Sequence, residues 1–343
     1  MPFRCFPIAG AISALVPAFA LAGQPVIVRN PDKPLWDPAR KIEFVRDLVI
    51  GDDDADGAAI FSRITDVAVD SRGRIIIADH VVRMFDSDGV FVRAIGSEGE
   101  GPGEYRYMTA VAVGPDDHVF VSGSGRICEF DADGQPVADF RRITGDYVRD
   151  LLVLHDGSLY AGAYDPPTRT VIQLYRAGKH VRGFCEAIRE TGDIGTRELP
   201  SYAGGYMDVG LDGMIYYTQT TPYEIRKFTP EGELVLRVLR ENDFINPPRI
   251  EKLENGFKMW AYAGSFRIVV LPDGRFLNFV GIPSGEDRPG TARVDLFDAA
   301  GKLLLSQAID REFGVLCMDG NGCVYVADRL VGPSVVRYRT KIP

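Results

Sequence analysis

The stretch from Asp66 to Gly96 constrains the fold of this chain more than any other part of the sequence. It reads as four short runs of β-branched and aromatic residues, separated by turns rich in Gly and Asp. The runs are Val67–Val69, Ile75–Ala78, Val81–Phe85 and Val90–Ile95. Four antiparallel strands of this length cannot bury both faces of the sheet that they form, so the unit needs to stack on copies of itself. We therefore expect a protein built from repeats.

The remainder of the chain supplies those copies. The turn between the first and second strands of the unit recurs, with apolar strands on both sides, at Gly73, Asp117, Gly157, Gly213, Gly274 and Gly322. The intervals between these turns range from 40 to 61 residues, and the blades of β-propellers repeat about every 40–50 residues. The spacing predicts six blades, two of which are enlarged by insertions.

The two ends of the chain complement each other. The sixth unit has no room for a fourth strand, whereas Lys41–Gly51 resembles a fourth strand that has no blade ahead of it. Pairing Phe44–Ile50 with Val335–Tyr338 would close the ring without an open sheet edge. We predict an all-β fold, a six-bladed β-propeller closed by an N-terminal strand that completes the last blade. It occupies residues 41–343 as a single domain, after an extended lead-in at residues 23–40.

Residues 1–22 have the form of a signal peptide. Arg4 precedes an apolar run from Ile8 to Leu21, and Ala20-Leu21-Ala22 has the small residues of a cleavage site. The run is too short and too rich in small residues for a good membrane span. We expect cleavage after Ala22 and a periplasmic or extracellular protein. An uncleaved anchor and a short buried helix are the alternatives.

The composition limits the partners and the role of the cysteines. A net charge of −9 and a pI near 5.1 argue against nucleic-acid binding, which needs clustered Lys and Arg.

After cleavage four cysteines remain, and an oxidising compartment would permit disulfides. Cys317 and Cys323 flank one expected hairpin turn, so a bridge between them is one option. The chain contains no C-x-x-C motif of a zinc ribbon or a thioredoxin site.

Several segments resemble a known family. IIIADHVVRMFDSDG, followed by VFVRAIGSEGEGPGEY, is similar to the signatures of NHL-repeat six-bladed propellers, and CVYVADRL and GRICEFDADG repeat parts of them. The resemblance implies the propeller architecture for residues 41–343 and is sharpest in the first, second and sixth units. The family includes scaffolds, sensors, a peptide-amidating lyase and lactonase-like enzymes, so it does not fix a function.

Two insertions interrupt the repeat. Glu186–Gly205 is a polar connection into the fourth unit. The second insertion, at about residues 248–262, places Ile250, Leu253, Phe257 and Trp260 at helix-like spacing. We expect a short amphipathic helix against one end of the ring, either as a lid over the central channel or as a packed decoration.

Candidate ligand-binding residues gather where the second strands are expected to end and the first strands to begin. Counting from the turn residues places there Asp79, His80, Arg149, Gln219, Asp328 and Arg329. Ring closure would make Asp79 and Asp328 neighbours, so an acid, a base and cations would lie near one axis and suit an anionic or hydroxylated ligand. The alternative is structural, because such Asp residues often accept loop N–H groups and a loop histidine often faces solvent. The same count places the beginnings of the first strands at Thr65, Thr109, Arg149, Gly205, Phe266 and Gly314.

An acidic loop precedes the first unit. Asp52, Asp54 and Asp56, followed by Gly57, match the start of a calcium-binding loop. The twelfth position is Arg63, where a bidentate Glu would be expected. Calcium and a solvated acidic turn are both open, and we expect no other cofactor.

These observations leave three functional hypotheses. The first is a non-enzymatic secreted scaffold that binds a protein, peptide or glycan, and the sequence favours it because it shows no convergent nucleophile and base. The second is a metal-assisted hydrolase or lyase of lactonase type, which would need Glu, Asn and Asp to converge at the channel. The third is a structural subunit docked on a membrane complex outside the cytoplasm. The sequence does not define the oligomeric state.

Overall fold

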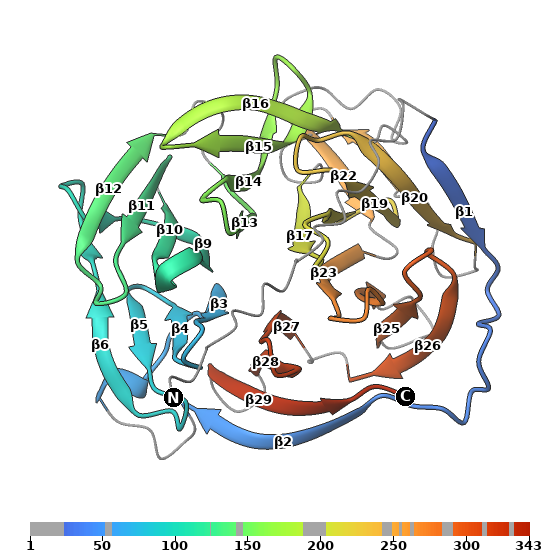
Figure 1. The fold of residues 1–343 in the computed structure, drawn as a ribbon, viewed down its shortest axis with the longest axis horizontal. Coiled ribbons are helices and arrows are strands. Elements are labelled where there is room, and N and C mark those ends of the chain that lie inside the picture. The colour runs from blue at the N-terminus through green and yellow to red at the C-terminus, as the bar shows by residue number, and fades with distance from the viewer. Residues whose placement is uncertain are drawn as a thin grey trace, which may run out of the picture.

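The computed structural model describes residues 24–51, 57–123, 125–141, 147–187, 204–241, 249–253, 256–260, 264–282, 291–310, 314–328 and 333–343. Within these residues the chain forms six sheets of four or five strands, arranged in a ring around a central axis (Figure 1). The all-β, six-bladed propeller predicted from the sequence is confirmed.

Each blade is an antiparallel meander that runs from the axis outward. Blade 1 contains β3 (Asp66–Val69), β4 (Ile75–Ala78), β5 (Val82–Phe85) and β6 (Phe91–Ile95), and blade 2 contains β9 (Met108–Val113), β10 (Val119–Gly123), β11 (Arg126–Phe130) and β12 (Pro136–Arg141). Blade 3 contains β13 (Asp150–Val153), β14 (Leu159–Asp165), β15 (Thr170–Arg176) and β16 (Lys179–Glu186), and blade 4 contains β17 (Gly205–Val209), β18 (Ile215–Gln219), β19 (Glu224–Phe228) and β20 (Leu234–Arg240). Blade 5 contains β23 (Gly264–Val270), β24 (Phe276–Ile282), β25 (Thr291–Phe297) and β26 (Leu303–Ile309), and blade 6 contains β27 (Gly314–Met318), β28 (Cys323–Asp328) and β29 (Ser334–Lys341). Short additions are the strand pair β7 (Ser97–Glu98) and β8 (Glu104–Tyr105) and two 3₁₀ turns, η1 (Gly57–Ala59) and η2 (Pro115–Asp117).

The turn between the first and second strands explains why the repeat is visible in the sequence. All six turn residues found by counting have positive φ, from +61° at Asp117 to +84° at Gly274. Glycine adopts this left-handed conformation without steric cost, and Asp tolerates it better than most residues. The backbone therefore requires a Gly or an equivalent residue once in each blade.

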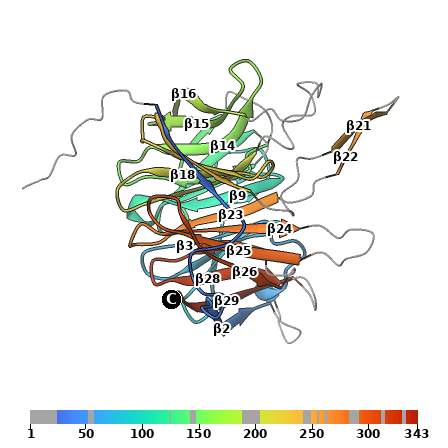
Figure 2. The ribbon, with the colours of Figure 1, turned by 90° about the vertical axis from the view of Figure 1, so that its right-hand side faces the viewer.

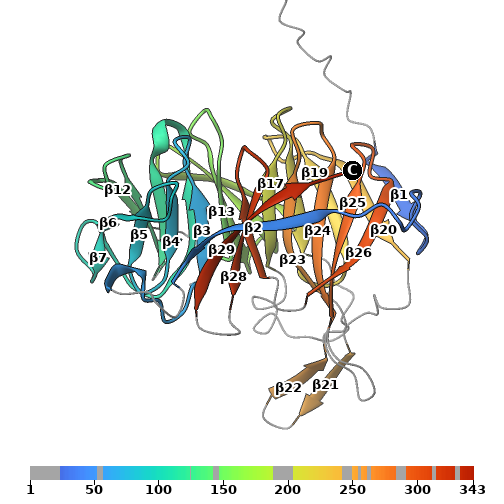
Figure 3. The ribbon, with the colours of Figure 1, turned by 90° about the horizontal axis from the view of Figure 1, so that it is seen from below.

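The N-terminal strand β2 (Glu43–Ile50) completes blade 6. It pairs antiparallel with β29, with Phe44 opposite Thr340 and Ile50 opposite Val335, as predicted (Figures 1 and 3). The register shifts between Arg46 and Leu48, around Asp47. The Asp47 carboxylate accepts hydrogen bonds from Arg337 Nε at 2.9 Å and Arg339 Nε at 2.6 Å. These ion pairs add side-chain contacts to the main-chain closure of the ring.

The lead-in is more structured than the sequence indicated. Residues 24–42, which we call the N-terminal strap, begin with β1 (Val26–Asn30), a fifth strand that pairs parallel with β20 at the outer edge of blade 4. The strap then passes blade 5, where the N–H groups of Leu35 and Trp36 donate to the carbonyls of Leu303 and Leu304 at 3.1 and 2.9 Å. It therefore contacts blades 4 and 5 before β2 begins in blade 6.

The insertion predicted as a helix at about 248–262 is instead a β-hairpin. The strands β21 (Arg249–Leu253) and β22 (Gly256–Trp260) pair antiparallel, with Leu253 opposite Gly256. Figures 2 and 3 show the hairpin extending away from the ring. The helix prediction was wrong: apolar residues at apparent helical spacing lie on two paired strands, and Gly256, which disfavours a helix interior, begins the second of them.

The hydrophobic core lies between neighbouring blades. Between blades 1 and 2, for example, Ile76 and Met84 belong to one buried cluster with Val121 and Phe130. The four described cysteines are free thiols, so the bridge considered between Cys317 and Cys323 is not formed in this structure. Within the described residues, no helix is long and apolar enough to cross a membrane. Residues 1–23, which include the expected signal peptide, lie outside the described residues.

Candidate functional site

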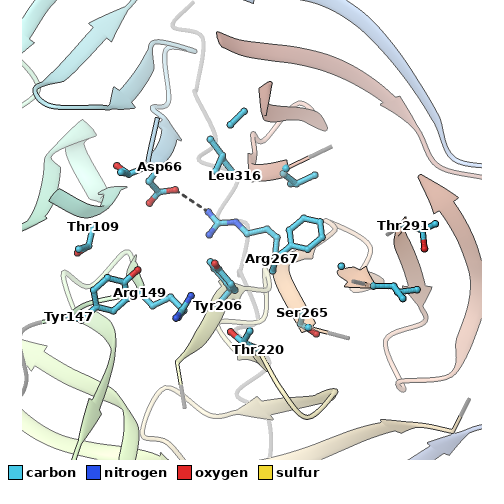
Figure 4. A pocket seen from close by; sticks show the side chains of 18 residues that line it. Asp66, Thr109, Tyr147, Arg149, Tyr206, Thr220, Ser265, Arg267, Thr291 and Leu316 are labelled. Atoms are coloured by element: carbon cyan, nitrogen blue, oxygen red, sulfur yellow. Dashed lines mark ion pairs between the residues drawn. The ribbon is translucent and has the colours of Figure 1, made fainter. Parts of the chain in front are cut away.

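A cavity of about 610 Å³ opens at the end of the ring where the first strands begin (Figure 4). All six blades contribute to its wall. It is lined by Thr65, Asp66, Thr109, Tyr147, Arg149, Tyr206, Thr220, Gly264, Ser265, Phe266, Arg267, Gly281, Ile282, Thr291, Gly314, Val315, Leu316 and Ala327. Its size lies within the range of small-ligand sites.

Two arginines and two tyrosines alternate along one side of this cavity. The Arg149 guanidinium carbon lies 5.5 Å from the ring centre of Tyr147 and 6.0 Å from that of Tyr206. Arg267 approaches the same Tyr206 ring at 5.6 Å. These distances are those of cation–π contacts. We call the series Tyr147, Arg149, Tyr206 and Arg267 the tyrosine–arginine column.

Arg267 is held by two carboxylates. Its side chain is 12% exposed and forms ion pairs with Asp150 at 3.2 Å and Asp66 at 3.9 Å (Figure 4 shows the pair with Asp66). Burial raises the pKa of Asp66 to about 7, although the Arg267 charge opposes this shift. Burial also raises the pKa of Asp150, with the same opposition from Arg267. The two carboxylates anchor Arg267 in the channel.

The carboxylates of the innermost strands also join blades. Asp66 accepts the N–H of Val111 in blade 2 at 3.0 Å. Asp150 accepts the N–H of Met207 in blade 4 at 2.6 Å. Asp208 of blade 4 accepts the N–H of Val270 in blade 5 at 2.7 Å, and burial raises the pKa of Asp208 to about 6. Their first role is therefore structural, because each satisfies a main-chain donor of the next blade.

Hydroxyl groups occupy other parts of the wall. Thr65 donates to the Ala78 carbonyl at 3.1 Å and Thr220 to the Gly204 carbonyl at 2.9 Å. The Ser265 hydroxyl accepts from the Asn278 amide at 3.0 Å. A hydroxyl whose proton is already donated retains lone pairs, so the oxygens of Thr65 and Thr220 suit a ligand that offers O–H or N–H donors.

Of the ligand-binding residues predicted from sequence, Arg149 lines this cavity. Asp79 is buried and accepts the N–H of Arg63 at 2.7 Å and the Ser62 hydroxyl at 3.0 Å. Burial favours a higher pKa for Asp79, but these hydrogen bonds outweigh it and lower the pKa. His80 is exposed and bonds to Ser62. These hydrogen bonds are those of the structural alternative, and ligand binding by Asp79 stays a prediction.

The other residues predicted to bind a ligand or a metal either do not line the cavity or lie outside the residues that the structure describes. Gln219 is buried and donates to the Thr221 carbonyl at 2.8 Å, and Asp328 ends β28 opposite Ser334. Neither lines the cavity. Arg329 and the calcium candidates Asp52, Asp54 and Asp56 lie outside the described residues. Within the described ranges, no group of three or more His, Cys, Asp or Glu side chains is placed to hold a metal ion.

Sequence reasoning missed Asp66, Tyr147, Tyr206 and Arg267. The signal was nevertheless present, because five of the six positions counted for the beginnings of the first strands line the cavity: Thr65, Thr109, Arg149, Phe266 and Gly314. Asp66 and Arg267 are the next residues after two of these positions, and Tyr206 follows the sixth position, Gly205.

Comparisons with known proteins support the fold. A family model described as a six-bladed β-propeller matches residues 58–144. A candidate exported protein from Bacteroides fragilis superposes with a TM-score of 0.58 at 10% identity, covering 93% of this chain and 100% of that chain. Virginiamycin B lyase from Staphylococcus aureus gives a TM-score of 0.52 at 10% identity, with 87% of this chain and 99% of that chain covered. The WD40 repeats of RRP9 also give 0.52 at 10% identity, with coverages of 88% and 98%.

No curated protein matches the sequence significantly. The similar structures include a lyase and a WD40-repeat protein, and at 10% identity the likeness is one of fold. The resemblance to NHL-repeat propellers therefore stays a prediction at the level of the subfamily. The chain is similar to β-propellers of several kinds, and its fold is the six-bladed β-propeller.

Proposed function

We propose that this protein is a non-enzymatic binding propeller, exported from the cytoplasm, that holds an anionic group of its ligand against the tyrosine–arginine column. One observation carries the proposal: Arg149 and Arg267 lie on one cavity to which every blade contributes. Guanidinium groups are well suited to carboxylates and other oxyanions because their N–H donors form a planar fork. Asp66 and Asp150 pair with Arg267, so Arg149 is the cation of this wall that we assign to the ligand.

We favour binding over catalysis because Asp66, the one carboxylate among the described residues of the cavity wall, already accepts two hydrogen bonds. Both oxygens of Asp66 accept main-chain N–H groups, those of Val67 and Val111, at 3.0 Å. This residue is thus committed to joining blades 1 and 2. The lactonase-type alternative needs Glu, Asn and Asp side chains that converge on a metal ion. Among the described residues that line the cavity, Asp66 is the one that carries a carboxylate. The docked-subunit alternative would be supported by co-purification with solubilised membranes.

The test is retention of acidic ligands by the mature protein, residues 23–343. Arrays of acidic peptides and acidic oligosaccharides are compared with neutral counterparts in which the carboxyl groups are amidated or esterified. We expect acidic members to be retained, and Arg149→Gln to weaken retention by about tenfold or more, the scale of one charge-assisted hydrogen bond. Arg29→Gln, on the exposed strap, is the matched control. Equal retention of acidic and neutral members would refute the proposal.

A further inference from the structure

We propose that the ligand of this cavity is a carboxylated saccharide, with the carboxylate of a uronate-type sugar on the tyrosine–arginine column and its hydroxyl groups on the Thr-lined wall. This inference rests on the proposed function and names the chemical class of its ligand. It goes beyond anion binding because it is argued from the threonine hydroxyl groups of the cavity wall as well as from the arginine.

The column places a cation beside two aromatic rings. The Arg149 guanidinium carbon lies 5.5 Å from the ring centre of Tyr147 and 6.0 Å from that of Tyr206. The N–H donors of a guanidinium form a planar fork that matches the two oxygens of a carboxylate. Tyr147 is 51% exposed, which leaves part of its ring accessible to the apolar C–H face of a sugar.

The rest of the cavity wall is better suited to hydroxyl groups of a ligand than to a second negatively charged group. Thr65 and Thr220 donate their protons to main-chain carbonyls and therefore present acceptor oxygens. Thr109 lies at the equivalent position of blade 2, and its hydroxyl is 3.5 Å from the Ser122 carbonyl oxygen. Acceptors would repel a second oxyanion but would pair with sugar O–H donors. One anionic group surrounded by several hydroxyl groups is the donor pattern of a uronate.

An acidic peptide is the competing ligand, and the inner strands argue against it. Extended peptides commonly bind by adding to an open strand edge. Here the inner-edge N–H groups of Val111, Met207 and Val270 already donate to Asp66, Asp150 and Asp208. One N–H group on the channel edge of each of three blades is thus already bonded to a side chain. We therefore expect side chains, more than main-chain groups, to contact the ligand in this cavity, and this is the usual mode of sugar binding.

The experiment is calorimetric titration of the mature protein with short oligomers of galacturonate, glucuronate, mannuronate and guluronate. Each is compared with its methyl ester, and a peptide of matched length containing glutamate is titrated in parallel. We expect at least one uronate oligomer to bind, its ester to bind at least tenfold more weakly, and the peptide to bind more weakly than the uronate. The ester comparison uses the unmodified protein, so it does not depend on a variant that folds.

Variants separate this inference from the proposed function. Arg149→Gln should weaken uronate binding at least tenfold, Arg149→Lys should weaken it less, and Arg29→Gln should leave it unchanged, with melting temperature as the check on folding. If the acidic peptide binds through Arg149 and no uronate does, the saccharide inference fails and the proposed function stands. If no acidic ligand binds, or binding is indifferent to esterification and to Arg149→Gln, both fail.

Discussion

Asn30 fastens the N-terminal strap to the ring, and its removal gives a sharp test of the fold. The residue is 3% exposed at the end of β1. Its side-chain amide donates to the Gly301 carbonyl at 2.9 Å, and its side-chain oxygen accepts the Leu303 N–H at 2.8 Å. Because the backbone of Asn30 pairs with blade 4 and its side chain with blade 5, it joins two blades.

The structure sets the size of the expected effect. Asn30→Ala leaves two main-chain groups of the β25–β26 turn without their partner, and a buried polar group left unpaired costs about 1–3 kcal/mol. Water entering the vacated space recovers part of this cost. We expect the free energy of unfolding to fall by about 2–4 kcal/mol. With an unfolding entropy of about 2.1 cal/mol/K per residue, the melting temperature should fall by about 3–6 °C.

The assay is urea denaturation of residues 23–343, followed by tryptophan fluorescence and far-ultraviolet circular dichroism. Arg29→Ala is the matched control, because Arg29 lies on the same strand and its side chain is 65% exposed in a 3.8 Å pair with Glu241. Exposed pairs contribute about 0–1 kcal/mol. If Asn30→Ala costs no more than Arg29→Ala, the strap is not fastened to the ring through this side chain, and the reasoning is wrong.

Two further predictions concern buried polar groups of blades 1 and 2. Tyr105→Phe should lower the free energy of unfolding by about 1–3 kcal/mol in urea titrations, because the Tyr105 hydroxyl accepts the Val82 N–H at 2.9 Å and donates to the Ile95 carbonyl; an unchanged midpoint would show that water replaces the hydroxyl. Burial raises the pKa of Asp66 to about 7, above the ordinary 3.8. The folded protein then binds a proton between these pH values that the unfolded chain has released, so its stability should fall as pH rises through this window, by roughly 4 kcal/mol at most. Asp66→Asn should reduce this slope in urea midpoints measured from pH 5 to 8, leaving the part that Asp208 contributes through its own raised pKa, and an unaltered slope would contradict the assignment.

The fold could be predicted from sequence because its most informative positions are set by the backbone. A turn that needs positive φ restricts its residue type locally, so Gly73 and its five equivalents mark the blades without any knowledge of packing. Ring closure followed from counting strands, and β2 pairs with β29 as expected. The partner of β1 could not be predicted in this way, because a fifth strand on blade 4 depends on the path of the strap around the ring.

The hairpin β21–β22 shows where periodicity misleads. In a window as short as Ile250 to Trp260, four apolar residues fit helical spacing by chance, and helix and strand cannot be separated on that basis. A Gly in the interior of a helix costs about 1 kcal/mol relative to Ala. In the structure this Gly pairs with Leu253 at the start of β22. The Gly was therefore a better guide than the apparent periodicity.

The site was harder to predict because the acidic residues near the axis have two different uses. Asp79 ends a second strand and holds the Ser62–Arg63 loop, whereas Asp66 begins a first strand and joins neighbouring blades. A sequence presents both simply as carboxylates near a channel, which suggests catalysis or metal binding. Because Asp66 and Asp79 are bonded to main-chain donors, they have structural uses that a sequence does not distinguish from ligand binding. If the proposed function is correct, Arg149→Gln should weaken the binding of acidic ligands at least tenfold while the melting temperature stays unchanged.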